Sequence, residues 1–147
     1  MSLKEQLKND MKSAMRGREK NRLAVIRMLN AAIKQREIDD STTLDDAGVL
    51  AVIEKMVKQR RDAAAQYRDA DRMELAEAEE AEIAVLDDYL PEQLSDEAID
   101  VAIDSAIADN NAESMRDMGK VMGALKRQLQ GQADMAVVSQ RLKAKLQ

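Results

Sequence analysis

Basic side chains and glycines recur near the C-terminus at a spacing that could bind phosphate groups. On a helix, with about 100° between successive residues, Arg116, Lys120 and Arg127 fall within roughly 40° of one another. Gly119 and Gly123 lie beside them. Like charges one turn apart repel, and a glycine inside a helix costs about 0.5–1 kcal/mol relative to alanine. A helix that served stability alone would avoid both features.

Two interpretations of this basic row and its glycines remain open. Glycines beside cations would let another backbone come close while lysine and arginine reach its anionic oxygens. Alternatively, a neighbouring helix of the same protein packs closely on the glycines. The spacing alone slightly favours close packing.

Signals for a single helix flank these residues. Ser114 can accept hydrogen bonds from the first-turn amides, Asp117 complements the positive helix end, and Gly131 can adopt the left-handed conformation that closes a helix. We therefore expect one helix between Ser114 and Gly131. Its other side carries an apolar stripe within roughly 60° of one direction, formed by Met118, Val121, Met122, Leu125 and Leu129.

A last helix is predicted after this one, with Asp134 as its cap. Its apolar residues Val138, Leu142 and Leu146 are expected to point inward. Its outward positions are basic and comprise Arg141, Lys143 and Lys145.

The composition limits the classes of protein and of chemistry. The chain has 147 residues, of which 45% are hydrophobic and 35% charged, with one proline and two aromatic residues. This profile is typical of a soluble all-helical protein. Because the chain has no cysteine and no histidine, thiol nucleophiles, imidazole bases and most zinc sites are excluded. We expect no catalytic residues, no metal and no cofactor.

The first residues do not form a hydrophobic leader, and no apolar run approaches the roughly eighteen residues that a membrane span needs. We therefore expect a cytoplasmic protein with no membrane contact. Net charge is −5 but is uneven: residues 1–36 carry +7, residues 37–113 carry −17 and residues 114–147 carry +5. Since the local patch governs contact with phosphate more than the total does, RNA stays possible as a partner.

The periodicity predicts an all-α protein with two domains. Pro91 disfavours helix at the preceding residue and removes an amide donor, so it marks the linker. We predict an N-terminal four-helix domain over 1–90 and a small C-terminal three-helix domain over 95–147. The expected helices end near Arg16, Asp39, Asp69, Tyr89 and Asp109, ahead of the two described above.

Charged residues on the predicted third and fourth helices should pair. Arg60 and Arg61 interrupt the apolar stripe of the third helix (Leu50, Ile53, Val57, Ala64 and Tyr67), and an unpaired charge facing a core is costly. The fourth helix, with Leu75 and Leu86 on its inner face, places Glu79 and Glu82 on that same side. We predict an ion pair between one of these arginines and one of these glutamates. The basic rows on the first two helices are interpreted as solvated.

Five blocks of sequence, in this order and over nearly the whole chain, resemble the YqeY family: Arg27–Lys34, Lys58–Asp62, Glu80–Leu86, Tyr89–Leu94 and Met118–Leu125. The resemblance implies a four-helix domain joined to a domain similar to the tail of the B subunit of glutamine-dependent tRNA amidotransferase. That tail is implicated in holding tRNA, while the chemistry occurs in other domains and subunits.

The resemblance implies specific site residues in this chain. Gly119, Lys120 and Gly123 match the motif itself, while Lys126, Arg127, Arg141, Lys143 and Lys145 are neighbouring basic positions, to which the outward face adds Arg116. Two departures concern local turns. Asp71 and Met135 stand where the family commonly has glycine.

Three functions are compatible with this sequence. The first is a tRNA-binding accessory, associated with an amidotransferase or with the tRNA-charging machinery. The second is a carbon–nitrogen ligase that takes glutamine as its amido donor, which the family relationship suggests but for which the chain offers no nucleophile or phosphate-binding loop. The third is a protein–protein adaptor. The sequence does not reveal the oligomeric state.

Overall fold

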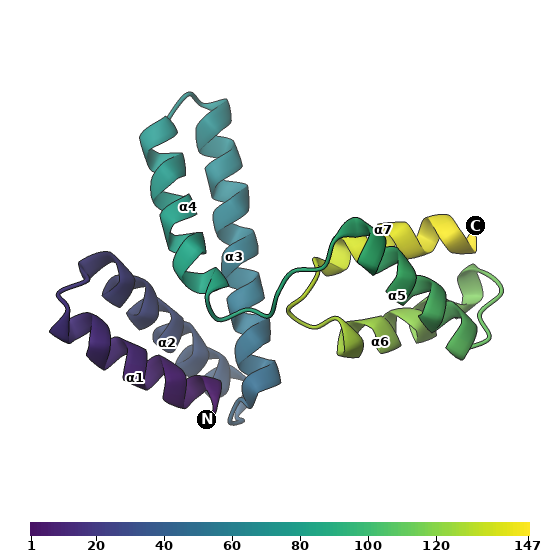
Figure 1. Ribbon diagram of the computed structural model, residues 1–147, viewed down its shortest axis with the longest axis horizontal. Coiled ribbons are helices and arrows are strands. Elements are labelled where there is room, and N and C mark those ends of the chain that lie inside the picture. The colour runs from purple at the N-terminus through teal and green to yellow at the C-terminus, as the bar shows by residue number, and fades with distance from the viewer. The chain divides into compact units, whose positions relative to one another are not determined.

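A computed structural model describes the whole chain, residues 1–147, as helices joined by short turns, with no β-strand (Figure 1). The all-α prediction is therefore confirmed. The elements are α1 (Leu3–Arg16), α2 (Lys20–Asp40), α3 (Asp46–Asp69), α4 (Met73–Asp87), α5 (Asp96–Asp109), the 3-10 turn η1 (Met115–Asp117), α6 (Met118–Gln128) and α7 (Met135–Leu146).

Side chains cap four of these helices, as the sequence suggests. Ser2, Asp45, Ser95 and Asp134 precede α1, α3, α5 and α7, and each accepts a hydrogen bond from an amide in the first turn. These bonds satisfy donors that have no partner inside a helix. The helix starts are therefore encoded locally.

The chain divides into two compact units, Met1–Leu90 and Pro91–Gln147. The first contains α1 to α4, and the second contains α5, η1, α6 and α7. In the first unit, α1 and α2 form one antiparallel hairpin, and α3 and α4 form another (Figure 1).

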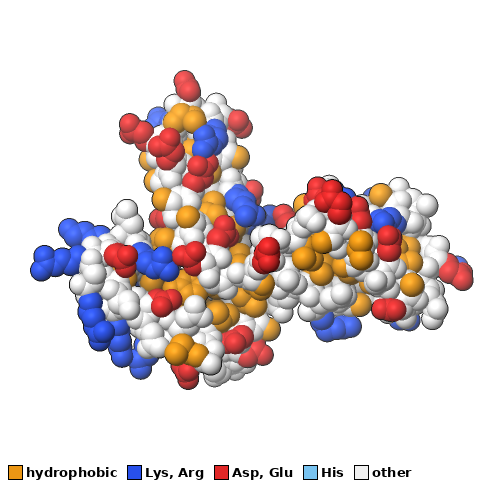
Figure 2. Space-filling view, in the orientation of Figure 1, with side chains coloured by type: hydrophobic (Ala, Val, Ile, Leu, Met, Phe, Trp, Pro, Cys, Tyr) orange, Lys and Arg blue, Asp and Glu red, His pale blue; other side chains and the backbone are white.

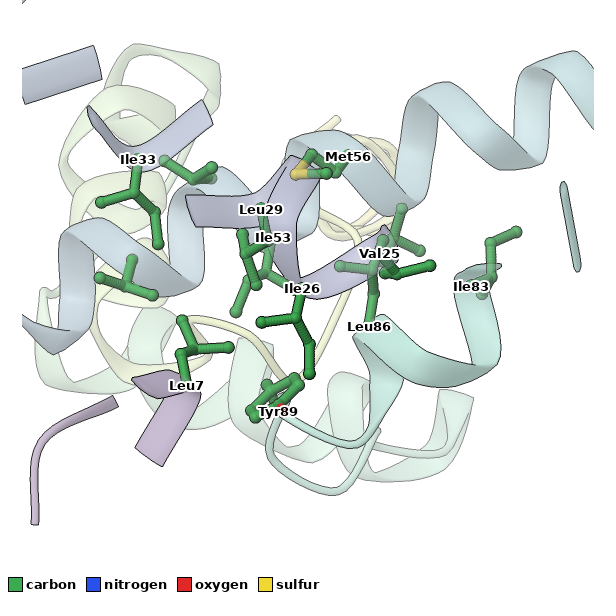
Figure 3. Packing of buried hydrophobic residues seen from close by; sticks show 13 residues of the cluster. Leu7, Val25, Ile26, Leu29, Ile33, Ile53, Met56, Ile83, Leu86 and Tyr89 are labelled. Atoms are coloured by element: carbon green, nitrogen blue, oxygen red, sulfur yellow. The ribbon is translucent and has the colours of Figure 1, made fainter. Parts of the chain in front are cut away.

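The core of the first unit is apolar and draws on all four helices. Leu7, Ile26, Leu29, Ile53 and Leu86 have no exposed surface, and Figure 3 shows their side chains turned toward a common centre. Such large buried residues each contribute about 1.5–3 kcal/mol through burial. They orient α1 so that its opposite side faces solvent.

The predicted ion pair between α3 and α4 is confirmed. Arg60 Nε donates to Glu82 Oε2 over 2.9 Å, and the Arg60 side chain is only 15% exposed. Arg60 also donates from Nη1 to the carbonyl oxygen of Met56 at 3.2 Å. The arginine that interrupts the apolar stripe is thus compensated at both ends of its guanidinium group, whereas Arg61 is exposed.

Two residues of the first unit that were predicted to face the core, Leu75 and Leu50, are not fully buried. Leu75 is 42% exposed, and the inward residue of that helical turn is Ala76. Leu75 lies near the start of α4, where the α3–α4 hairpin extends beyond α1 and α2 (Figure 1), so α3 alone packs against this part of the helix. Leu50 is only partly buried because Val49, Val52 and Met56 occupy the core face beside Ile53.

Asp71 adopts the conformation that glycine prefers. Its φ is 61°, in the left-handed region, and the next amide, that of Arg72, closes the turn by donating to Tyr67 O at 2.7 Å. Aspartate tolerates this region better than most residues. Met135, at the other departure from the family pattern, is simply the first residue of α7.

The second unit packs three short helices around its own core. Its fully buried residues include Ile103 of α5, Val121 and Leu125 of α6, and Val138 and Leu142 of α7. The apolar stripes predicted for α6 and α7 are confirmed, although Met118 and Met122 lie at the edge and are only partly buried.

The segment predicted as one helix from Ser114 to Gly131 is divided. It begins with the 3-10 turn η1, continues as α6, and ends at Gln128. The 3-10 start is defined by the backbone bond from Asp117 N to Ser114 O at 3.0 Å, and the capping box between the Ser114 and Asp117 side chains and each other's backbone amides accompanies it. Gly131 does have the expected positive φ of 79°, but within the turn that follows the helix.

Candidate nucleic-acid interface

The start of α6 is held by two carboxylate–amide hydrogen bonds. Asp117 Oδ2 accepts from the backbone amides of Glu113 at 2.9 Å and of Ser114 at 3.3 Å. These bonds lower the pKa of the Asp117 carboxyl below its ordinary value, and the nearby charges of Arg116 and Lys120 act in the same direction. The turn therefore fixes the direction in which α6 leaves it.

The outward face of α6 and η1 carries exposed cations without acidic partners. Arg116, Lys120, Lys126 and Arg127 are all exposed, and none of them forms an ion pair. Basic side chains project on the α6 side of the second unit in Figure 2. We call these four residues, together with Gly119 and Gly123, the α6 face.

The two glycines of the α6 face are not packing positions. A Cβ atom built on Gly119 would meet no heavy atom within 4 Å, and one built on Gly123 would meet only Arg127 Nη1 at 4.0 Å. A neighbouring helix therefore does not occupy this side of α6, which removes the close-packing interpretation within the unit. The backbone here is open to an approaching ligand.

The basic residues of α7 have a different environment. Arg141 Nη1 lies 3.0 Å from Asp100 Oδ2, and Arg141 Nη2 lies 3.0 Å from Asp96 Oδ2. Lys145 Nζ lies 2.7 Å from Asp104 Oδ1. The hydrogen bond from Arg141 to Asp100 raises the pKa of the guanidinium group. These cations join α7 to α5.

The structure thus separates the predicted site residues into two groups. The α6 face is free of intramolecular partners, while Arg141 and Lys145 are engaged and Lys143 is exposed without an ion pair. Sequence reasoning missed the acidic partners on α5. Their regular spacing, Asp96, Asp100 and Asp104, matches that of Arg141 and Lys145 and was the available signal.

No group of three or more acidic side chains has a geometry that could hold a metal ion. None of the helices combines the length and apolar character that crossing a bilayer requires.

The fold and the site define a class: an all-helical protein whose second unit presents unpaired cations beside accessible glycine backbone. A family model described as "Yqey-like protein" matches residues 4–146. The chain therefore belongs to the YqeY family, as its sequence blocks suggested.

Curated relatives are fungal proteins. An uncharacterized protein of Schizosaccharomyces pombe is 30% identical over 89 residues, which cover 60% of this chain and 72% of that protein. "Altered inheritance of mitochondria protein 41, mitochondrial" of Pyrenophora tritici-repentis is 30% identical over 138 residues, or 92% of this chain and 76% of that protein. The protein of the same name in Lachancea thermotolerans is 35% identical over 85 residues, 57% of this chain and 46% of that protein.

The expected cytoplasmic location is contradicted by the names of the relatives from Pyrenophora tritici-repentis and Lachancea thermotolerans, which place those proteins in mitochondria. The expectation rested on the lack of a hydrophobic leader. Mitochondrial targeting segments are instead amphipathic and rich in arginine and serine, so that observation does not bear on them.

Proposed function

We propose that the second unit binds structured tRNA through its phosphate groups, with the α6 face as the contact surface. In this proposal the chain is an accessory that holds tRNA for an amidotransferase or for the tRNA-charging machinery, and chemistry occurs on a partner. Membership of the YqeY family and the likeness of Met118–Leu125 to the amidotransferase tail support this role.

One observation carries the proposal: none of the cations of the α6 face forms an ion pair, whereas Arg141 and Lys145 of α7 do. A lysine or arginine without an ion pair inside the protein has its positive charge available to an external anion, whereas a paired one must first give up its partner. Lys120 and Arg127 meet this condition, and Arg141 does not. Accessible backbone at Gly119 adds room for a sugar-phosphate chain to approach closely.

The aromatic content indicates which part of the RNA would be recognised. The chain has no tryptophan or phenylalanine, and both tyrosines, Tyr67 and Tyr89, belong to the first unit. The second unit therefore has no side chain on which a splayed base could stack. Recognition of phosphate positions along a folded RNA fits these residues, and the affinity should then fall steeply with salt.

An accessory role also agrees with the residue types present. Without cysteine or histidine the chain lacks the usual nucleophile and base of a glutaminase. Ammonia release from glutamine by the pure protein would contradict the accessory role and favour a carbon–nitrogen ligase instead.

The test is a titration of bulk tRNA into the intact protein and into a Lys120→Glu, Arg127→Glu variant, at low and physiological salt. We expect the variant to lose on the order of tenfold or more in affinity, and the slope of log K against log salt to fall by about 2. Far-UV circular dichroism checks that the variant is folded.

A matched control has the same change in charge at another site. Lys55 and Lys58 of α3 are also exposed and unpaired, so Lys55→Glu, Lys58→Glu shifts net charge equally. Equal loss of affinity in both variants would indicate a general charge effect and would overturn the α6 face as the site.

A further inference from the structure

The hairpin of α1 and α2 carries the highest density of free positive charge in the chain. Of the ten lysines and arginines in residues 1–36, three form ion pairs: Lys4 with Glu37, Arg22 with Asp88 and Arg36 with Asp40. The other seven are exposed and unpaired, namely Lys8, Lys12, Arg16, Arg18, Lys20, Arg27 and Lys34.

Five of these cations follow one another along α1 and into the start of α2, with no paired cation between them. Lys8, Lys12 and Arg16 recur at every fourth residue of α1, Arg18 follows in the turn, and Lys20 is the first residue of α2. Figure 2 shows lysine and arginine side chains gathered along α1 and at this turn, with few acidic side chains among them. We call these five residues the hairpin patch; Glu5 precedes it in the sequence, and Glu19 lies within it between Arg18 and Lys20.

The fold presents this row as a rigid surface. Leu7 and Ala14, on the opposite side of α1, have no exposed surface, so α1 cannot rotate without opening the core. A four-residue step on a helix is about 6 Å, so the row from Lys8 to Arg16 is about 12 Å long. Since B-DNA carries one charge per about 3.4 Å of helix axis on each strand, a row of this length can face several phosphates of a double helix.

A nucleic-acid backbone fits this patch better than a lipid surface does. An interfacial helix inserts apolar side chains beside its cations. The apolar stripe of α1 is instead buried or half-buried in the core, and Met15 is the one large apolar side chain of α1 that is exposed. A row of cations with no apolar face that could insert into a membrane is better matched to the phosphates of a nucleic acid, which are hydrated and regularly spaced.

We propose that the hairpin patch, on the first unit, is a second phosphate-binding surface for structured RNA, in addition to the α6 face on the second unit. This inference rests on the proposed function, because it assigns the same class of ligand to both surfaces. Each surface adds its own phosphate contacts, so each contributes to the affinity and to its dependence on salt.

The experiment compares tRNA binding by the intact protein and a Lys8→Glu, Lys12→Glu, Arg16→Glu variant across a salt series. The matched control is Lys55→Glu, Lys58→Glu, Arg61→Glu, which reverses three exposed, unpaired cations of α3. We expect the α1 variant to lose at least about tenfold in affinity and to lower the salt slope by about 2 to 3, with a smaller change in the control. Lys8→Gln, Lys12→Gln, Arg16→Gln repeats the test if the acidic variant does not fold.

The outcomes separate this inference from the proposed function when the Lys120→Glu, Arg127→Glu variant is measured in the same series. If that variant loses affinity while the α1 variant matches its control, the hairpin patch is overturned and the α6 face stands. If the α1 variant alone loses affinity, the patch stands and the α6 face is overturned. Absence of tRNA binding by the intact protein overturns both.

Vesicles that contain anionic phospholipid test the alternative that the hairpin patch binds a membrane surface. We expect the intact protein and the α1 variant to sediment alike with such vesicles. Loss of vesicle binding by the α1 variant, with unchanged tRNA affinity, would assign the patch to a membrane surface and overturn the proposal.

Discussion

Helices α6 and α7 belong to the same unit and have a similar pattern of apolar and basic residues, yet their basic residues differ in whether they form ion pairs. Both helices bury an aliphatic stripe, and both carry lysine and arginine on the other side. On α7 the cations Arg141 and Lys145 meet acids of α5, while on α6 Lys120 and Arg127 meet none.

The difference shows that the acids on adjacent helices, rather than the number of cations, decide where an external anion can bind. A cation already paired within the fold must first lose its partner, whereas a free one only exchanges its water and counterions. Helical spacing alone would rank α6 and α7 equally.

The largest expected effect is on stability and comes from the buried leucines that both helices contribute to the core. Leu125 of α6 and Leu142 of α7 have no exposed surface. We expect Leu125→Ala and Leu142→Ala each to reduce the free energy of unfolding of the second unit by about 2–5 kcal/mol, because each leaves a cavity. Urea denaturation followed by far-UV circular dichroism measures this. Val101→Ala on α5, at a side chain that is 66% exposed, serves as the control, and a large effect there would contradict the assigned core.

A smaller effect, of opposite sign, should come from the glycines that distinguish α6. We expect Gly119→Ala and Gly123→Ala each to stabilise the protein by about 0.5–1 kcal/mol, since alanine favours the helix and the added methyl groups meet no close contact. Affinity for tRNA should fall at the same time, because the methyl groups occupy the backbone approach.

Thermal denaturation and tRNA titration of the same glycine variants provide the measurement. Gly48→Ala is the contrasting control, because its new Cβ would lie 2.8 Å from Leu44 Cδ2, and we expect it to destabilise. Stabilised α6 variants with unchanged affinity would show that RNA does not approach the glycines.

The smallest expected effect is on the acid sensitivity of the α6 start. The pKa of Asp117 is lowered in the folded protein, so its carboxylate contributes stability above the unfolded pKa of about 3.9. That contribution is lost as pH falls through the lower, folded pKa. We expect Asp117→Asn to be less stable than wild type at neutral pH and to approach it below about pH 4. A constant difference across the acid range would contradict this.

Much of the fold follows from local sequence signals. Capping residues such as Ser95 and Asp134 and the 3.6-residue periodicity locate all seven α-helices to within a few residues, and the cost of a buried charge predicts the Arg60–Glu82 pair. These features depend on neighbours along the chain or on one facing helix, which a single sequence can indicate. That residues 1–90 and 95–147 are separate domains stays a prediction.

The candidate site was less predictable because it depends on which helices face each other. Open space at Gly119 and the partners of Arg141 require the packing of three helices to be known. The exposure of Leu75 has the same origin, since it depends on how far the α3–α4 hairpin extends beyond α1 and α2. Whether the α6 face binds RNA does not follow from packing, and the titrations test it.

The placement of the two tyrosines restricts the aromatic circular dichroism signal to one of the two units. Tyr67 and Tyr89 both lie in the first unit, and Tyr89 is buried with its hydroxyl donating to Asp10 Oδ2 at 2.6 Å. The chain has no other aromatic side chain, so near-UV circular dichroism reports the packing of that unit alone, while the far-UV signal sums the helices of both. Comparing the two spectra during one melt therefore separates the unfolding of the units without any added label.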